Sequence, residues 1–326
     1  MAAFGNRTFA MTPRDTAPAF LQSCGWGGAR LAPLAGDASF RRYFRVADDD
    51  RAAVLMDAPP PEEDVRPFLA VADHLRRHGF RPPAILGADS DAGFLLLEDF
   101  GDTLMRDAVA ADPGGEHAVY AAAIDLLKAL HRCPPADLPP YDRAVIQREA
   151  GLFTQWYAPA VGLAVDEAGY AAAWDAVFDA LAPAAPVTVL RDYHAENIML
   201  LGDGSMGLLD FQDALVGHPA YDLVSLLQDA RRDVAPALEM AMLARYGGID
   251  RAAYAAWGAQ RNAKILGIFT RLWKRDGKPR YLAYQPRVWR YLERDLMHPA
   301  LEPVRDWFDR NLPVHAREAF WRDRAE

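Results

Sequence analysis

The hydrophobic pattern of this chain changes once, near residue 100, and that change limits the folds available to it. Before it, apolar runs bounded by turn residues predict five strands, Ala29–Leu34, Ser39–Val46, Ala52–Met56, Ile85–Ala88 and Phe94–Glu98. One helix with a single apolar face interrupts them between Val65 and Gly79. Five strands and one helix predict a small β-rich lobe over residues 1–100.

The remaining residues, 101–326, have a mainly helical pattern. Helices are expected over Glu116–His131, Ala171–Leu181 and Tyr221–Val234, because apolar residues recur there at the spacing of one helix face. A short β-rich segment, Val187–Asp210, interrupts these helices. A length of 326 residues suits two packed lobes, so we expect an α+β protein with a larger helical C-terminal lobe.

Composition excludes several classes of protein. The formal net charge of −9 argues against a surface that binds nucleic acid or anionic lipid. Only two cysteines occur, Cys24 and Cys133, so neither a disulfide framework nor a paired-cysteine zinc site can be built. Residues Met1–Thr12 lack the apolar core of a signal peptide, and no apolar stretch of the chain is long enough for a membrane span. We therefore expect a cytoplasmic monomer with no nucleic-acid or membrane partner.

A glycine-rich match, Gly202–Gly207, has the letters of a dinucleotide-binding loop. Such a loop must lie between a strand and a helix, so that the helix N-terminus faces the pyrophosphate. Here strand-like segments precede and follow it, and Asp203-Gly204 is a turn signal. The match is therefore interpreted as the tip of a hairpin.

The β-rich segment carries the residues best suited to chemistry. Asp192 is followed five residues later by Asn197, and Asp210 begins an Asp-Phe pair thirteen residues further on. Phosphoryl transfer from ATP needs a carboxylate near the acceptor hydroxyl and oxygen ligands for the metal ions on the phosphates. Asp192 suits the first task, and Asn197 and Asp210 suit the second.

With these motifs the chain resembles the aminoglycoside-phosphotransferase-like kinases, relatives of the protein kinases. The resemblance implies a bilobal protein-kinase-like fold that uses ATP and Mg²⁺. It matches Asp192 to the catalytic base and Asn197 and Asp210 to the metal ligands. It also implies a hinge at Leu97–Gly101 and nucleotide contacts from one set of residues, namely Ser39, Arg42, Arg45, Glu98 and Phe100.

Within that superfamily the chain looks closest to bacterial anomeric kinases of N-acetylmuramate and N-acetylglucosamine, which serve peptidoglycan recycling. The segments that carry this likeness include Ala38–Arg45, Met56–Pro60, Leu209–Ala214 and Leu266–Leu282. The resemblance implies ATP-dependent phosphorylation of the sugar C1 hydroxyl.

Two positions depart from the family pattern, and one matching position has two interpretations. Leu190 stands where relatives usually carry a histidine, and Met56 stands where kinases of this shape place a lysine on the third strand. Another cation must then meet the triphosphate, and Arg41, Arg42 and Arg45 are candidates because a guanidinium forks onto phosphate oxygens. Asp222 matches an aspartate that supports the catalytic loop, but it is equally interpreted as a carboxylate in a first helical turn.

The segment from Arg261 to Arg294 is basic in an otherwise acidic chain, with ten basic and two acidic side chains. Aromatic residues interleave with the cations, which suits a sugar that bears a carboxylate, such as N-acetylmuramate. Lys274, Lys278 and Arg280 are the candidate substrate residues. The alternative is a solvated helix face, the usual role of a run of charges.

Two other functions remain open at this stage. A kinase of another hydroxyl substrate, such as an aminoglycoside or a choline-like alcohol, would use the same motifs, although a cationic substrate suits the basic segment badly. A catalytically silent nucleotide sensor would explain the missing lysine at Met56. It would leave the joint presence of Asp192, Asn197 and Asp210 unexplained.

Overall fold

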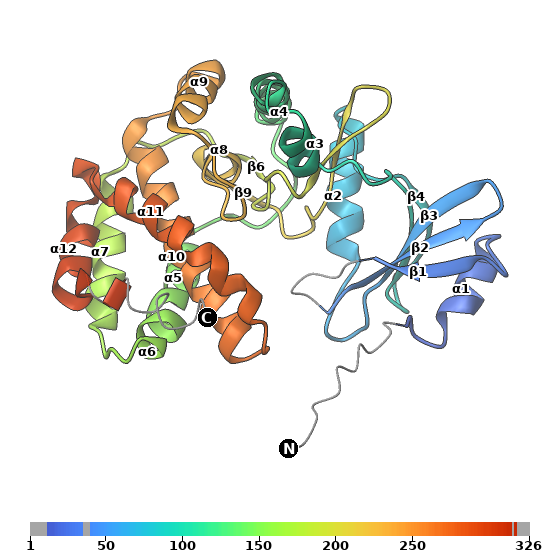
Figure 1. Ribbon diagram of the computed structural model, residues 1–326, viewed down its shortest axis with the longest axis horizontal. Coiled ribbons are helices and arrows are strands. Elements are labelled where there is room, and N and C mark those ends of the chain that lie inside the picture. Colours follow the sequence, from blue (N-terminus) through green and yellow to red (C-terminus); the bar gives the residue numbers. More distant parts are fainter. Residues whose placement is uncertain (1–11, 35–39, 315, 318–326) are drawn as a thin grey trace. The chain divides into compact units, whose positions relative to one another are not determined.

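The computed structural model describes residues 12–34, 40–314 and 316–317 (Figure 1). Contacts divide the chain into two units. The N-terminal unit comprises residues 1–103 together with 201–212, and the C-terminal unit comprises residues 104–200 and 213–326. Within the described ranges, no helix has the length and apolar character needed to cross a membrane.

The N-terminal unit is built on an antiparallel five-stranded sheet of order β1-β2-β3-β5-β4. Its elements are α1 (Ala17–Ser23), β1 (Arg30–Pro33), β2 (Arg42–Asp48), β3 (Arg51–Asp57), α2 (Arg66–Arg77), β4 (Ile85–Asp89), β5 (Phe94–Glu98) and β8 (Met206–Leu208). All five predicted strands of the sheet are therefore present; β5 has the predicted ends, and the ends of the other four differ by a few residues.

Strand alternation gives this sheet two different faces. Phe44 and Val46 of β2 point to the same face as Leu55 of β3, and α1 covers that face with Phe20 and Leu21. The Phe20 and Phe94 rings stack at 5.4 Å. In Figure 1, α1 and α2 lie on opposite sides of the sheet. A side chain on β2 is consequently directed either toward α1 or toward the α2 side.

The C-terminal unit is mainly helical, with one small antiparallel pair of strands, β6 and β9. Its elements are α3 (Met105–Ala111), α4 (Glu116–Leu130), α5 (Arg143–Ala150), η1 (Phe153–Tyr157), α6 (Ala158–Ala160), α7 (Glu167–Ala180), β6 (Val187–Val189), β7 (Ile198–Leu200), β9 (Leu215–Gly217), α8 (Ala220–Leu227), α9 (Pro236–Tyr246), α10 (Arg251–Lys274), η2 (Pro279–Tyr284), α11 (Gln285–Leu296), η3 (Pro299–Leu301) and α12 (Glu302–Asn311).

Helix α10 is the centre of this unit. It begins at Asp250, whose side chain caps the helix by accepting a hydrogen bond from the Ala253 backbone N–H at 2.8 Å. Most of its residues are buried on all sides, because α5, α8, α11 and η1 pack around it. A helix enclosed in this way places its few polar side chains inside the protein, where each needs a partner.

One predicted helix is shorter in the structure than in the sequence analysis. The prediction of Tyr221–Val234 as helical is wrong beyond Leu227, where α8 ends. The Asp229 carboxylate accepts a hydrogen bond from the Arg231 backbone N–H at 2.8 Å, which offers the backbone an alternative to the helix. The residues from 228 to 235 therefore form a loop before α9.

Close packing around α10 predicts a stability effect at Gly267. A Cβ atom there would lie 2.3 Å from the Leu152 carbonyl oxygen, which belongs to the backbone and cannot rotate away. We expect Gly267→Ala to lower the free energy of unfolding by about 1–3 kcal/mol, although alanine is normally the better helix former. Thermal melting measures this. The control Gly202→Ala, which meets nothing within 4 Å, should melt like the wild type; equal melting of all three proteins would contradict the prediction.

Candidate active site

Asp192 and Asn197 lie on one tight loop of the C-terminal unit, between β6 and β7. Backbone hydrogen bonds close the loop, from the His194 N–H to the Asp192 carbonyl at 3.1 Å and from the Asn197 N–H to the His194 carbonyl at 2.9 Å. The Asn197 amide also donates through Nδ2 to the Asp192 carbonyl, at 2.9 Å. The spacing of five residues therefore brings both polar side chains to one short turn.

Asp222 holds the start of this loop. Its carboxylate is fully buried and accepts hydrogen bonds from the Leu190 and Arg191 backbone N–H groups, at 2.7 and 2.8 Å. Arg191 has a φ of 70°, a left-handed conformation that costs energy in a residue with a side chain. The two bonds to Asp222 offset that cost, so this aspartate supports the loop that carries Asp192 as well as standing in the first turn of α8.

A second buried carboxylate, Glu149 of α5, anchors the same loop from its other side. Glu149 pairs with Arg191 and with Lys264 of α10, whose Nζ lies 2.8 Å from Oε2. Burial raises the pKa of Glu149, but the charges of Lys264 and Arg191 outweigh it and leave the pKa below its usual value. Glu149 therefore stays ionised and joins α5, α10 and the loop.

The Asp192 carboxylate is itself reached by solvent, with 46% of its side chain exposed. Dense surrounding protein raises its pKa, whereas His194, Lys264 and Arg261 lower it, and the net direction is downward. The Arg261 Nη2 atom lies 4.0 Å from Asp192 Oδ1. Asp192 is consequently an accessible, ionised carboxylate, as a proton acceptor at neutral pH must be.

Asp210 belongs to the N-terminal unit and also has a left-handed backbone, with a φ of 56°. Its Oδ1 accepts a hydrogen bond from Gln212 Nε2 at 3.0 Å and lies 3.5 Å from Arg41 Nη2. The next residue, Phe211, is fully buried and packs against Phe68 of α2 at 4.7 Å between ring centroids. This aromatic contact fixes the backbone that presents Asp210.

The two arginines predicted as nucleotide contacts are both paired with carboxylates of the N-terminal unit. Arg42 shares the α1 face with Asp57, to which its Nη2 donates at 2.8 Å. Arg45 points to the other face and binds Asp99 and Asp102, at 2.6 and 2.8 Å. The geometry does not favour Arg42 as a phosphate ligand, and both assignments stay predictions.

The predicted hinge residues have structural partners as well. The Glu98 carboxylate accepts from Arg81 Nη2 at 3.0 Å and from the Ala84 N–H at 3.1 Å. Phe100 lies under the Arg81 guanidinium, and its ring fills the space where Gly207 would carry a Cβ. Ser39 lies outside the described residues. The nucleotide role of all three residues stays a prediction.

The glycine-rich match at Gly202–Gly207 is a turn, as predicted. The Gly204 N–H donates to the Leu201 carbonyl and the Leu201 N–H to the Ser205 carbonyl, both at 2.9 Å. Strand β8 follows, and no helix begins there. The helix N-terminus that a dinucleotide loop requires is therefore missing from this segment.

The basic segment 261–294 is not one surface. Arg261 and Lys264 are buried, and the rings of Phe269, Tyr281 and Tyr284 pack against one another. The candidate substrate residues lie at the end of α10 and beyond it. Lys274 is exposed over the Trp273 ring at 4.0 Å, and Arg280 Nη2 donates to the Tyr281 hydroxyl at 3.2 Å. Lys278 is half-buried, and the substrate role of this trio stays a prediction.

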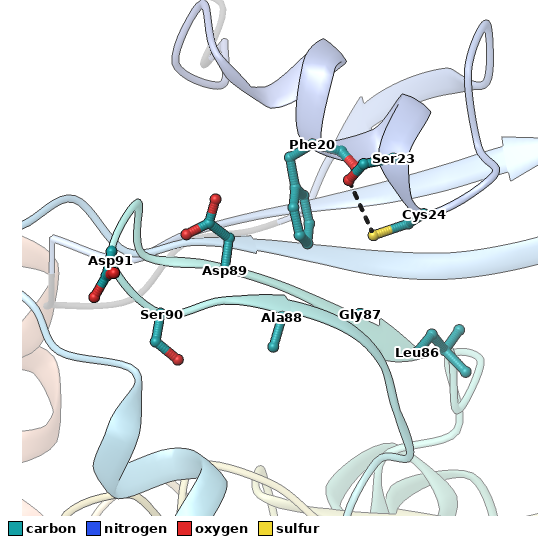
Figure 2. Close-up of a pocket in the computed structure, with 9 residues that line it drawn as sticks. All are labelled: Phe20, Ser23, Cys24, Leu86, Gly87, Ala88, Asp89, Ser90 and Asp91. Carbon is teal, nitrogen blue, oxygen red and sulfur yellow. Dashed lines mark hydrogen bonds between the residues drawn. The ribbon is translucent and has the colours of Figure 1, made fainter.

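A cavity of about 580 Å³ opens in the N-terminal unit between α1 and the edge strand β4 (Figure 2). Phe20, Ser23 and Cys24 line one side, and Leu86–Asp91 line the other. None of the predicted nucleotide residues lines it. Carboxylates of Asp89 and Asp91 stand at its edge, so a triphosphate would meet like charge there.

Asp210 and Asn197, each within its own unit, carry the kind of oxygen that Mg²⁺ prefers. Asp210 offers a carboxylate, and the Asn197 amide, whose Nδ2 donates to the Asp192 carbonyl, would offer its Oδ1. Mg²⁺ is usually held by one or two such oxygens together with substrate phosphates, not by a cage of protein ligands. The described part of the chain contains no cluster of three His, Cys, Asp or Glu residues suited to a metal.

Sequence reasoning missed several residues that shape this site. Glu149 and Ser225 are polar residues within otherwise helical patterns, and nothing in the sequence pairs them with a loop tens of residues away. Arg261 and Lys264 were noted as part of the basic segment. Their spacing of three residues on one helix face was the available signal that they act together.

Solved structures of two other proteins share the fold of this chain. A choline/ethanolamine kinase family protein from Mesorhizobium loti superposes with a TM-score of 0.64 at 18% identity, covering 90% of this chain and 99% of that one. An ADP-bound aminoglycoside phosphotransferase superposes with a TM-score of 0.59 at 14% identity, covering 82% of this chain and 95% of that one. The fold is therefore that of the small-molecule kinases, which confirms the predicted fold class.

The chain belongs to the phosphotransferase enzyme family, whose model matches residues 30–257. A protein of Caulobacter vibrioides named N-acetylmuramate/N-acetylglucosamine kinase is 38% identical, over 92% of this chain and 96% of that protein. A protein of Pseudomonas aeruginosa with the same name is 42% identical, over 82% of this chain and 85% of that protein. The predicted kinase membership is confirmed.

Proposed function

We propose that this protein transfers the γ-phosphoryl group of ATP to the C1 hydroxyl of N-acetylmuramate, N-acetylglucosamine or both. The observation that carries the proposal is Asp192, an ionised and accessible carboxylate on a loop anchored by Asp222 and Glu149. The names of relatives 38–42% identical to this chain support the choice of sugar. The proposal includes a monomeric enzyme in the cytoplasm.

The reaction needs one proton acceptor and two bond changes at phosphorus. Asp192 accepts the proton of the C1 hydroxyl while the C1 oxygen forms a bond to the γ-phosphorus. The bond between that phosphorus and the bridging oxygen breaks, and ADP leaves with the electron pair. Asn197 and Asp210 would hold Mg²⁺, which neutralises phosphate charge when it is bound.

Phosphorus NMR of the product tests the proposed function. With N-acetylmuramate or N-acetylglucosamine and MgATP, we expect a sugar 1-phosphate and ADP in equal amounts. Aminoglycosides and choline-like alcohols form the comparison panel. Turnover of the panel without turnover of either amino sugar would assign the protein to another substrate. ATP binding without any transfer would favour a silent nucleotide sensor.

Arg41 is the best candidate to replace the missing lysine, because its Nη2 atom lies 3.5 Å from Oδ1 of Asp210, the proposed metal ligand. We expect Arg41→Ala to raise the KM for ATP by about tenfold or more, the size of a lost charge-assisted hydrogen bond. Steady-state kinetics at saturating sugar measure it. Arg66→Ala, which removes an exposed arginine, is the control. An unchanged KM for ATP in the Arg41 variant would exclude this role.

The candidate substrate cations at the end of α10 and beyond it predict a difference between the two sugars. If Lys274, Lys278 or Arg280 meets the carboxylate of N-acetylmuramate, its replacement by alanine should raise the KM for that sugar by about tenfold to a hundredfold. The KM for N-acetylglucosamine, which has no carboxylate, should stay nearly unchanged. Three single variants measured with both sugars decide it. If all three alanine variants changed the KM of both sugars equally, these residues would be interpreted as a solvated surface without a role in recognising the carboxylate.

A further inference from the structure

Arg261 of α10 is a buried cation that faces the proposed base. Only 5% of its surface is exposed, and a charge taken out of water is costly unless it is paired. Among the residues that the structure describes, its single ion-pair partner is Asp192, with 4.0 Å between Nη2 and Oδ1, and Asp192 has no second ion pair there. Asp192 is therefore the counter-ion of a buried arginine.

The two cations closest to this pair have another carboxylate. Lys264, one turn further along α10, lies 2.8 Å from Glu149, and Arg191 of the loop pairs with the same carboxylate. Their charges serve mainly to keep Glu149 in place. Of the three cations, Arg261 is the one whose charge is balanced by Asp192 alone among the described residues.

The same nitrogen of Arg261 also holds the backbone that leads into Asp192. Nη2 donates to Ser225 Oγ at 2.8 Å, and Ser225 Oγ donates to the Arg191 carbonyl at 3.1 Å. The N–H of Arg191 is bound by Asp222, so both polar groups of this left-handed residue are fixed. Because Nη2 carries two hydrogens, one is available to Ser225 and the other to the carboxylate.

We propose that Arg261 is a positioning residue for Asp192. Through Ser225 it fixes the peptide bond before Asp192, and through the ion pair it holds Oδ1. Oδ2 is then directed to the acceptor hydroxyl and receives its proton. Arg261 is buried, so it acts through Asp192 and not on the substrate. The inference rests on the proposed function, in which Asp192 is the proton acceptor.

Orientation matters here because solvent reaches 46% of the Asp192 side chain. A half-exposed carboxylate that is held only by its own backbone can rotate away from the substrate. A displacement of about 1 Å in a reacting group costs on the order of a hundredfold in rate. We therefore expect Arg261→Gln, which removes the charge and shortens the side chain, to lower kcat by about tenfold to a hundredfold. The KM for ATP should stay nearly unchanged.

A double-mutant cycle tests whether Arg261 acts through Asp192. The kcat of the full-length wild type, Arg261→Gln, Asp192→Asn and the double variant is measured at saturating MgATP and acceptor sugar. If the arginine only positions the base, its replacement should lower kcat in the wild type and have little further effect once Asp192 is an asparagine. Damage that is independent of Asp192 would multiply the two losses.

Three further variants complete the test. Arg261→Lys keeps the charge, so it should recover part of the kcat that Arg261→Gln loses. Ser225→Ala removes the bridge to the backbone but keeps the ion pair, and its loss should not multiply with that of Arg261→Gln. Arg251→Gln, which removes an exposed arginine from the same helix, is the matched control and should keep the wild-type kcat. Melting curves check the fold, and if Arg261→Gln does not fold, the cycle is run with Arg261→Lys.

The outcomes separate this inference from the proposed function. Equal losses from the Arg261 replacement with and without the Asp192 carboxylate overturn the inference and assign the arginine a structural role. An Arg261→Gln variant with the kcat of the wild type overturns it as well, and both results leave the function intact. A wild type that phosphorylates another acceptor of the panel, and neither N-acetylated sugar, refutes the proposed function; the same cycle with that acceptor still decides the role of Arg261.

Discussion

Asp192→Asn should lower kcat by about 10²–10⁴, the usual contribution of a general base. The substitution keeps the size of the side chain but removes its ability to accept the proton of the C1 hydroxyl. The loop should persist, because it is held through the backbone of Leu190 and Arg191 by Asp222, not by the Asp192 carboxylate. ATP binding should therefore be retained, as measured by titration with a fluorescent nucleotide.

Asp203→Asn, in the exposed turn before β8, is the matched control and should keep full activity. The pH profile adds a second measurement. Because the pKa of Asp192 is lowered, its carboxylate remains ionised through the weakly acidic range. The wild-type rate should thus fall on its account only in strong acid. An Asp192 variant that kept more than half of the wild-type kcat would refute the assignment.

In the N-terminal unit, local pattern was sufficient to predict the sheet. Alternation of apolar residues and the turn residues between them are local signals, and β5 (Phe94–Glu98) has the predicted bounds. Helix α1 was not predicted. The direction of the arginines was also missing from the sequence, because alternation separates Arg42 from Arg45 but does not say which face α1 covers.

In the C-terminal unit, the motif residues could be predicted from the sequence, but the residues that hold their loop in place could not. Asp192 and Asn197 are joined by a spacing of five residues, which any reader of the sequence can recognise. Glu149, in contrast, acts through Lys264 and Arg191, which are far from it in the chain and meet it only after α5 and α10 have packed. Long-range packing of this kind leaves no periodic signal.

The early end of α8 is a second feature that hydrophobic periodicity did not predict, although its cause lies only a few residues away in the chain. The apolar spacing continues past Leu227, so periodicity alone predicts a longer helix. The Asp229 side chain competes for the Arg231 N–H, and this local hydrogen bond ends the helix.

Asp210→Asn should reduce activity by more than about a hundredfold, since a charged metal ligand is lost and even outer-shell partners of a metal are worth tenfold to a hundredfold. The variant should fold, because an asparagine at this position still accepts the hydrogen bond from Gln212, and Phe211 still packs on Phe68. Asp213→Asn, an exposed neighbour, is the matched control.

Titration of Mg²⁺ against rate for wild type, Asp210→Asn and Asp213→Asn separates a ligand from a residue that merely ends a strand. If Asp210 binds the metal, its amide replacement offers a neutral oxygen in place of a charged one, and raised Mg²⁺ should restore little of the lost rate. Arg41 should make the loss of metal binding larger, because without the Asp210 carboxylate its positive charge would repel Mg²⁺ from this position. An Asp210 variant with an unchanged Mg²⁺ midpoint and rate would show that the triphosphate is held without this side chain.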